Sequence, residues 1–320
     1  MSYAELHCLS NLSFLRGASH PAELVARAAA LGYRALALTD ECTLAGVVRA
    51  HVAAREHGLQ LIVGAEFRLE DGTLLVLLAP DREAYAALSA LITLARRRSP
   101  KGQYRLRSAD LELHARGCLG VWIPAPEGSA PEWRHAAATL RETLPGRLWV
   151  GIETLRGAAE QARYLALQGV AAEHGLPMLA CGGVLMHEPV RKPLADVLTA
   201  IRLGRPVQAL GRRLAPNAER HLRPVATLRR LYPPQLLEET LRVAARCRFS
   251  LDELRYEYPR EVVPPGRTPS AWLRELVLAG AAKRWPAGVT PRVMAMLERE
   301  LTLIRELSYE YYFLTVHDIV

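Results

Sequence analysis

Apolar residues in the first two-thirds of the chain alternate between short continuous runs and helical spacing. The runs are typical of buried strands and fall at 35–39, 61–63, 74–78, 119–123, 148–152 and 178–180. Segments 21–32, 44–58 and 158–174 instead repeat apolar residues with the period of an amphipathic helix. This alternation predicts an α/β fold with parallel strands, in a barrel or an open sheet.

Local signals set the ends of these predicted helices. Pro21 suits a first helical position, with Ser19 or His20 as the cap, and Gly32 and Gly58 suit helix ends. In the second helix one face carries apolar residues and one histidine: Leu44, Val47, Val48, His51 and Val52.

The strand signal fades after about residue 207. Helices are predicted at 222–231, 234–247, 271–285 and 291–307, with a Pro-rich, charged linker at 256–266. The aromatic stretch 311–320 is typical of a buried strand or helix, and we expect the chain to be a piece of a longer protein.

The chain is basic, with a net charge of +8. Most of its cationic residues are Arg, which favours nucleic-acid phosphate as a partner, although Arg that simply replaces Lys on solvated faces explains the composition equally well. The densest basic cluster, at 96–107, suits a solvated loop or an intramolecular contact. A second cluster supplies candidate contacts to a DNA backbone, namely Arg212, Arg213, Arg220 and Arg223.

The five cysteines are scattered and form no CxxC pair, which argues against disulfides or a cysteine-based zinc site and favours a reducing cytoplasm. No apolar run approaches the ~20 residues that cross a bilayer, so no membrane association is expected.

Several residues that could bind metal follow the predicted strands. They are Asp40, Glu41, Glu66, Glu153 and His187, while His7 precedes the first helix. Strand ends converge at one face of an α/β barrel, where such groups could hold divalent metals and activate water for phosphoester hydrolysis. Acidic residues also cap helices after strands, so the pattern leaves both interpretations open.

Four segments resemble the motifs of the PHP (polymerase and histidinol phosphatase) family: 7–17, 38–41, 63–66 and 180–187. Segments 248–259, 272–276 and 313–320 resemble the approach to the palm, and the palm's beginning, in the error-prone branch of the bacterial C-family DNA polymerases. The resemblance implies a distorted, TIM-like βα barrel over 1–207, a helical connector over 208–263 and a truncated palm over 264–320.

The resemblance also implies metal ligands, and most of them are replaced here. Only His7 and Glu66 remain clearly, and Glu41 stands where the family has His. The other ligand places hold Leu9, Arg16, Leu74, Gly183 and Leu185. Leucine and glycine donate no lone pair, and arginine is a permanent cation. We therefore expect no catalytic metal, vestigial positions at His7, Glu41 and Glu66, and a structural barrel in which His7 and Glu66 stay hydrogen-bonded.

The parent protein implied by the resemblance is an error-prone translesion DNA-directed DNA polymerase in DNA repair and damage-induced mutagenesis. Its partners would be primer–template DNA, dNTPs, a sliding clamp and other mutagenesis proteins, and its palm aspartates would hold Mg²⁺ beyond residue 320. No catalytic residue and no bound cofactor are expected in this chain. Two alternatives are a metal-dependent PHP phosphoesterase or 3′–5′ exonuclease, and a protein-interaction scaffold of a mutagenic repair complex.

Overall fold

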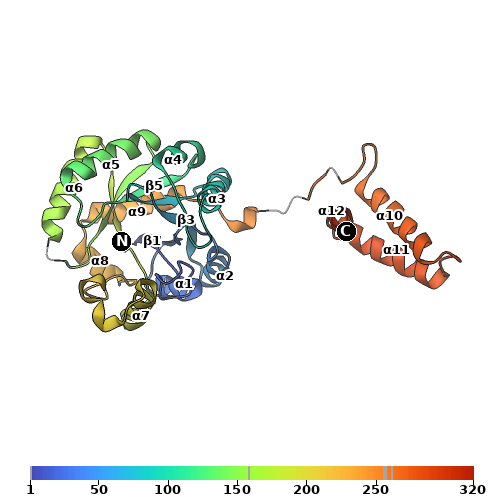
Figure 1. The fold of residues 1–320 in the computed structure, drawn as a ribbon, viewed down its shortest axis with the longest axis horizontal. Helices are drawn as coiled ribbons and strands as arrows, with labels where there is room; N and C mark the ends of the chain where they lie inside the picture. Colours follow the sequence, from blue (N-terminus) through green and yellow to red (C-terminus); the bar gives the residue numbers. More distant parts are fainter. Residues whose placement is uncertain (1, 158, 255–257, 261) are drawn as a thin grey trace. The chain divides into compact units, whose positions relative to one another are not determined.

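The computed structural model describes residues 2–157, 159–254, 258–260 and 262–320, in two compact units divided after Leu254. The first unit is a nearly closed barrel of seven strands inside a layer of helices (Figure 1). The strands pair in chain order: β1 (Ala4–Cys8), β2 (Ala35–Leu38), β3 (Gln60–Arg68), β4 (Leu74–Leu78), β5 (Leu119–Ile123), β6 (Leu148–Glu153) and β7 (Met178–Cys181). Backbone hydrogen bonds of 2.9 Å, from Leu9 N to Val184 O and from Val184 N to His7 O, join the end of β1 to the segment after β7. The predicted α/β barrel is confirmed.

One strand departs from the parallel arrangement that the sequence predicted. β4 runs antiparallel to both β3 and β5, whereas the other neighbours in the sheet are parallel. Only residues 69–73 connect β3 to β4, and a parallel return needs a crossover of a dozen or more residues. The short connection therefore forces a hairpin, and β4 is the exception to the parallel strands that the sequence predicted.

The helices of the barrel unit begin and end close to the predicted positions where a prediction was made. They are α1 (Pro21–Ala30), α2 (Val47–His57), α3 (Arg82–Arg97), α4 (Ser108–His114), α5 (Ala130–Thr143), α6 (Glu160–His174), α7 (Lys192–Leu203), α8 (Val225–Leu231) and α9 (Pro234–Arg246). His20 precedes α1, and its backbone N–H donates to the Glu23 carboxylate at 2.8 Å. Gly58 ends α2 with φ +63°, a conformation that costs glycine little. The sequence reasoning missed β1, α3, α4, α5 and α7.

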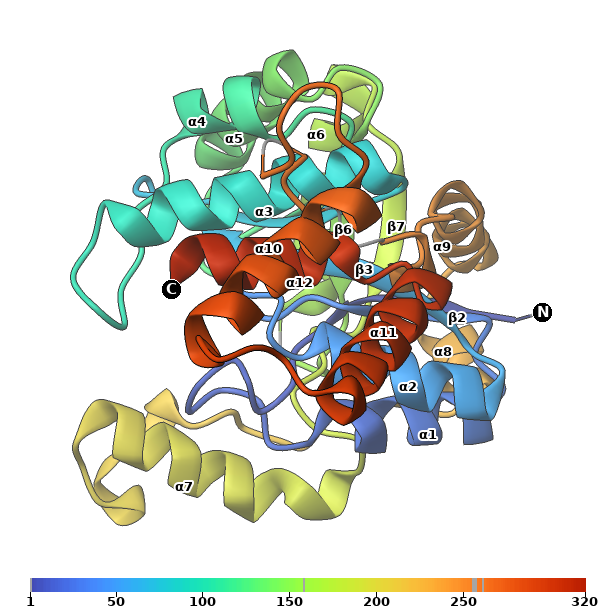
Figure 2. The same cartoon turned by 90° about the vertical axis from the view of Figure 1, so that its right-hand side faces the viewer.

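Only part of the apolar face that the sequence shows in α2 is buried. Val48 and Val52 are 63% and 52% exposed, while Val47 is buried together with alanines of the same helix. α2 packs against α1, beside which it runs in Figure 2. Small alanine side chains allow two helices to approach closely, so packing selected the alanine stripe over the valine stripe.

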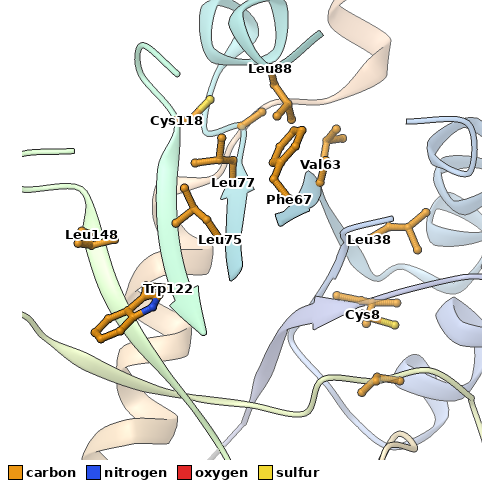
Figure 3. Close-up of a cluster of buried hydrophobic side chains, with 14 of the residues drawn as sticks. Cys8, Leu38, Val63, Phe67, Leu75, Leu77, Leu88, Cys118, Trp122 and Leu148 are labelled. Atoms are coloured by element: carbon orange, nitrogen blue, oxygen red, sulfur yellow. The ribbon is translucent and has the colours of Figure 1, made fainter. Parts of the chain in front are cut away.

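Buried side chains form two main clusters on either side of the barrel wall. One lies between the strands and the helices, where Phe67 and Leu77 of the sheet meet Leu88 of α3 (Figure 3). The other lies inside the barrel and includes Val243 and Ala244 from α9. Because α9 packs against β1 and β7, the segment predicted as a separate connector belongs to the barrel unit as far as Leu254, and no compact unit ends at residue 207.

The second unit contains α10 (Pro269–Arg284), α11 (Pro291–Glu306) and α12 (Glu310–Ile319). Thr268 and Thr290 cap the first two of these helices by accepting backbone N–H groups with their side chains. The aromatic segment 311–320 is helical, with Leu314 buried. Residues 158, 256, 257 and 261, which fall in the predicted helix 158–174 and the predicted linker, lie outside the described residues. None of the helices described here is long and apolar enough to cross a membrane.

Candidate functional site

A cavity of about 270 Å³ opens among residues at the carboxyl ends of the strands. His7 of β1, Glu66 of β3 and Glu153 of β6 line it, and all three side chains are buried. Arg16, from the loop after β1, and Arg220 also line it. The closure of the barrel thus brings together residues that are far apart in the sequence.

His7 lies between two carboxylates. Its Nε2 is 2.6 Å from Glu66 Oε2, and its Nδ1 is 3.0 Å from Glu153 Oε1. Burial opposes the charged imidazolium, but the hydrogen bonds to Glu153 and Glu66 prevail and raise the pKa of His7 to about 9. Near neutral pH the ring is therefore an imidazolium that donates from both nitrogens, as an ion-paired link between β3 and β6.

Two arginines complete this network. Arg16 Nη1 contacts Glu41 Oε2 at 2.6 Å and also contacts Glu66. Arg220 Nη2 contacts Glu153 Oε2 at 3.0 Å. Burial would raise the pKa of Glu66, but His7 and Arg16 hold it at about 2.

Burial would also raise the pKa of Glu153. Arg220 and His7 outweigh this effect and hold the pKa well below its usual value. Three cationic side chains, those of His7, Arg16 and Arg220, therefore face three carboxylates.

Gly183 makes room for one of these arginines. Its backbone has φ +53°, and a Cβ atom there would lie 2.2 Å from Arg220 Nη1 and 2.3 Å from Glu153 Oε1. Arg220 Nη1 also donates to the Gly183 carbonyl at 3.0 Å. The absence of a side chain at Gly183, where the sequence suggested a lost metal ligand, thus leaves the space that the Arg220 guanidinium occupies.

The remaining predicted residues have separate partners. Glu41 accepts a hydrogen bond from Tyr104 Oη at 3.0 Å in addition to its ion pair with Arg16. Asp40 accepts three hydrogen bonds of 2.7 Å from Ser10 and Ser13, so it braces the loop after β1. His187 lies outside the cavity lining and pairs through Nδ1 with Ser19 Oγ at 2.7 Å.

Sequence reasoning missed one buried carboxylate beside the site. Glu5 of β1 accepts hydrogen bonds from the backbone N–H groups of His7 and Gly182 at 3.0 Å and from Tyr3 Oη at 3.0 Å. Burial raises its pKa. The unpredicted strand β1 carries it, and no local pattern marked it.

Comparison with known proteins adds the family. The family model described as "PHP domain" matches residues 5–143. The chain carries a PHP domain. A second model, "Bacterial DNA polymerase III alpha NTPase domain", matches residues 271–320, beyond the PHP domain.

Relatives match across almost the entire chain. An error-prone DNA polymerase of Methylococcus capsulatus is 56% identical over 99% of this chain, and one of Pseudomonas aeruginosa is 55% identical over 100% of it. The chain spans about 30% of the length of each of these relatives. Among solved structures, an amidohydrolase from Chromobacterium violaceum aligns with a TM-score of 0.45 and 17% identity, over 56% of this chain and 86% of its own.

The side chains that line this cavity do not fit a catalytic metal cluster. Both ring nitrogens of His7 are engaged by carboxylates, so neither offers a lone pair. Glu66 and Glu153 are neutralised by guanidinium groups, and Leu9 and Leu185, which line the cavity, offer no lone pair. Within the described ranges no group of three or more His, Cys, Asp or Glu side chains is arranged to hold a metal ion.

The candidate DNA-contacting arginines have different environments. Arg212 and Arg213 are exposed in a short 3₁₀ helix, Gly211–Arg213. Arg220 is engaged in the cavity, whereas Arg223 is 1% exposed and donates to Thr154 O at 2.7 Å. A guanidinium buried in this way has no access to a DNA backbone, so the expectation for Arg223 was wrong.

Proposed function

We propose that this chain is the N-terminal part of an error-prone DNA-directed DNA polymerase, and that its PHP barrel is a structural scaffold. The similarity to error-prone polymerases over 99% or more of the chain supports the first statement. In this proposal nucleotidyl transfer belongs to palm aspartates outside these 320 residues, which hold Mg²⁺ and act on primer–template DNA and dNTPs in the cytoplasm. A sliding clamp and other mutagenesis proteins are the proposed partners.

The observation that carries the scaffold role is the engagement of both His7 nitrogens by Glu66 and Glu153. An imidazolium held between carboxylates neither binds a metal ion nor accepts a proton from water. The ion pairs of Arg16 and Arg220 extend this link to the loop after β1 and to the segment after α7. The groups that would serve hydrolysis in an intact site thus hold the barrel mouth together.

Metal analysis tests the scaffold role directly. After dialysis against metal-free buffer, we expect far less than one equivalent of any transition metal per chain and no phosphodiester hydrolysis with added Mn²⁺ or Zn²⁺. His7→Gln is the matched control, because it keeps a hydrogen-bonding side chain but removes the imidazole. Two or three tightly bound ions, with hydrolysis that His7→Gln abolishes, would contradict the proposal.

Primer extension tests where the polymerase chemistry resides. The 320-residue chain, purified to homogeneity, should extend a primer no faster than a mock preparation, because the proposal assigns no palm aspartate to it. Extension above the mock level would show that nucleotidyl transfer needs nothing outside these residues.

A further inference from the structure

The cavity at the barrel mouth holds guanidinium groups that the ion-pair network leaves unmatched. Besides Arg16 and Arg220, it is lined by Arg68, the last residue of β3, and by Arg202 of α7. Across the described ranges, the Arg202 side chain has no hydrogen bond or ion pair, and the Arg68 guanidinium has only the Gly72 carbonyl, at 3.3 Å.

The arginines also outnumber the carboxylates. Glu66 and Glu153 line the cavity and pair with Arg16 and Arg220. Glu41 is outside the lining and forms an ion pair with Arg16. Even without the imidazole, four guanidinium groups therefore meet three carboxylates. Two exposed guanidinium groups, those of Arg68 and Arg202, carry charge that no carboxylate of the described chain neutralises.

We propose that this cavity binds a compact oxyanion of the phosphate type, without a metal. A guanidinium group presents paired N–H donors that match two phosphate oxygens. The volume of about 270 Å³ is several times the ~30 Å³ that a water molecule occupies, so a tetrahedral anion fits. Leu9, Leu74 and Leu185 line the same cavity and exclude part of the water, which strengthens the attraction between the charges.

The same chemistry has two sources, free phosphate and the terminal phosphate of a nucleic-acid strand. Both would place phosphate oxygens in the cavity that Arg68 and Arg202 line, and they differ only in what remains outside it. The inference does not depend on the polymerase proposal, because it rests on the charges and lining of the cavity alone.

Isothermal titration calorimetry of the 320-residue chain with sodium phosphate tests the site, in a phosphate-free chloride buffer at fixed ionic strength. We expect saturable binding that Arg202→Gln weakens about tenfold, as for one lost hydrogen bond between charged groups. Arg49→Gln is the matched control, because Arg49 is likewise an exposed helical arginine but lies in α2, outside the cavity lining. Thermal unfolding in chloride should be the same for both variants, since neither side chain has a hydrogen-bond or ion-pair partner in the part of the chain that the structure describes.

A thymidine trinucleotide with a 5′-phosphate, compared with its 5′-hydroxyl form, separates the two sources. Tighter binding of the phosphorylated form than of free phosphate, sensitive to Arg202→Gln, assigns the site to a strand end. Tighter binding of free phosphate, with the same sensitivity, assigns it to the free anion. The proposal is overturned if phosphate gives no saturable signal, or if Arg202→Gln and Arg49→Gln bind phosphate equally.

Discussion

Gly183→Ala should destabilise the barrel by displacing the Arg220 guanidinium from its place beside Glu153. The new Cβ would lie 2.2 Å from Arg220 Nη1 and 2.3 Å from Glu153 Oε1. The guanidinium is the end of a flexible side chain and swings away readily, and Glu153 Oε1, which lies 3.0 Å from His7 Nδ1, must shift as well. The main cost is therefore the lost ion pair, together with the strain of an alanine at φ +53°.

The structure sets the size of the effect. An alanine in the left-handed region costs about 1–2 kcal/mol. Breaking a fully buried ion pair costs roughly 3–5 kcal/mol. The Arg220 side chain is 26% exposed, so we expect about 2 kcal/mol for its pair with Glu153. The total for Gly183→Ala is then about 3–4 kcal/mol.

Gly175→Ala isolates the contribution of the backbone. Gly175 ends α6 with φ +64°, and a Cβ there would meet nothing within 4 Å. It carries the same strain and the same loss of chain entropy in the unfolded state, without displacing a side chain. This variant should lose only about 1–2 kcal/mol.

Thiol labelling at increasing urea concentration measures the barrel by itself. All five cysteines are buried, and all lie in the unit that ends at Leu254. Their modification therefore reports the unfolding of the barrel and is insensitive to the helices that follow. Equal destabilisation by Gly183→Ala and Gly175→Ala would refute the reasoning. In an Arg220→Met background the ion pair is already absent, so Gly183→Ala should lower the free energy of unfolding by less than it does in the natural sequence. An equal loss in both backgrounds would also refute the reasoning.

Three further predictions concern other parts of the barrel unit. Because folding raises the pKa of His7 from 6.5 to about 9, its stabilisation is complete below pH 6.5 and is lost as the pH rises through about 9; His7→Gln should flatten this decline in urea midpoints followed by circular dichroism. Val47→Ala should cost about 1–2 kcal/mol in urea unfolding, whereas Val48→Ala, at an exposed position of the same helix, should stay within ±0.5 kcal/mol. If Arg212 and Arg213 contact DNA phosphates, replacing both by Gln should reduce the log–log salt slope of DNA binding by about 1.8, measured by fluorescence anisotropy, and an unchanged slope would contradict the contact.

Local features of the sequence were enough to predict many of the strands and helices. The apolar run that became β2 is short and continuous, and Gly58 ends α2 because glycine adopts positive φ at little cost. The sequence also shows what a single side chain can or cannot do. Leu9, for example, has no lone pair and cannot bind a metal ion in any fold. The expected contact between His7 and Glu66 is present, with 2.6 Å between His7 Nε2 and Glu66 Oε2.

The tertiary structure decided which side chains meet. Arg220 looked like a free basic residue in the sequence, yet closure of the barrel pairs it with Glu153, 67 residues earlier in the chain, in the space that Gly183 leaves. Packing on α1 buried the alanine stripe of α2 and left Val48 exposed. Hydrophobic spacing shows that a face is apolar but not what packs against it, and charge shows that a residue is cationic but not which carboxylate it will meet. Both depend on distances between segments that are remote in sequence, and only the closed barrel sets those distances.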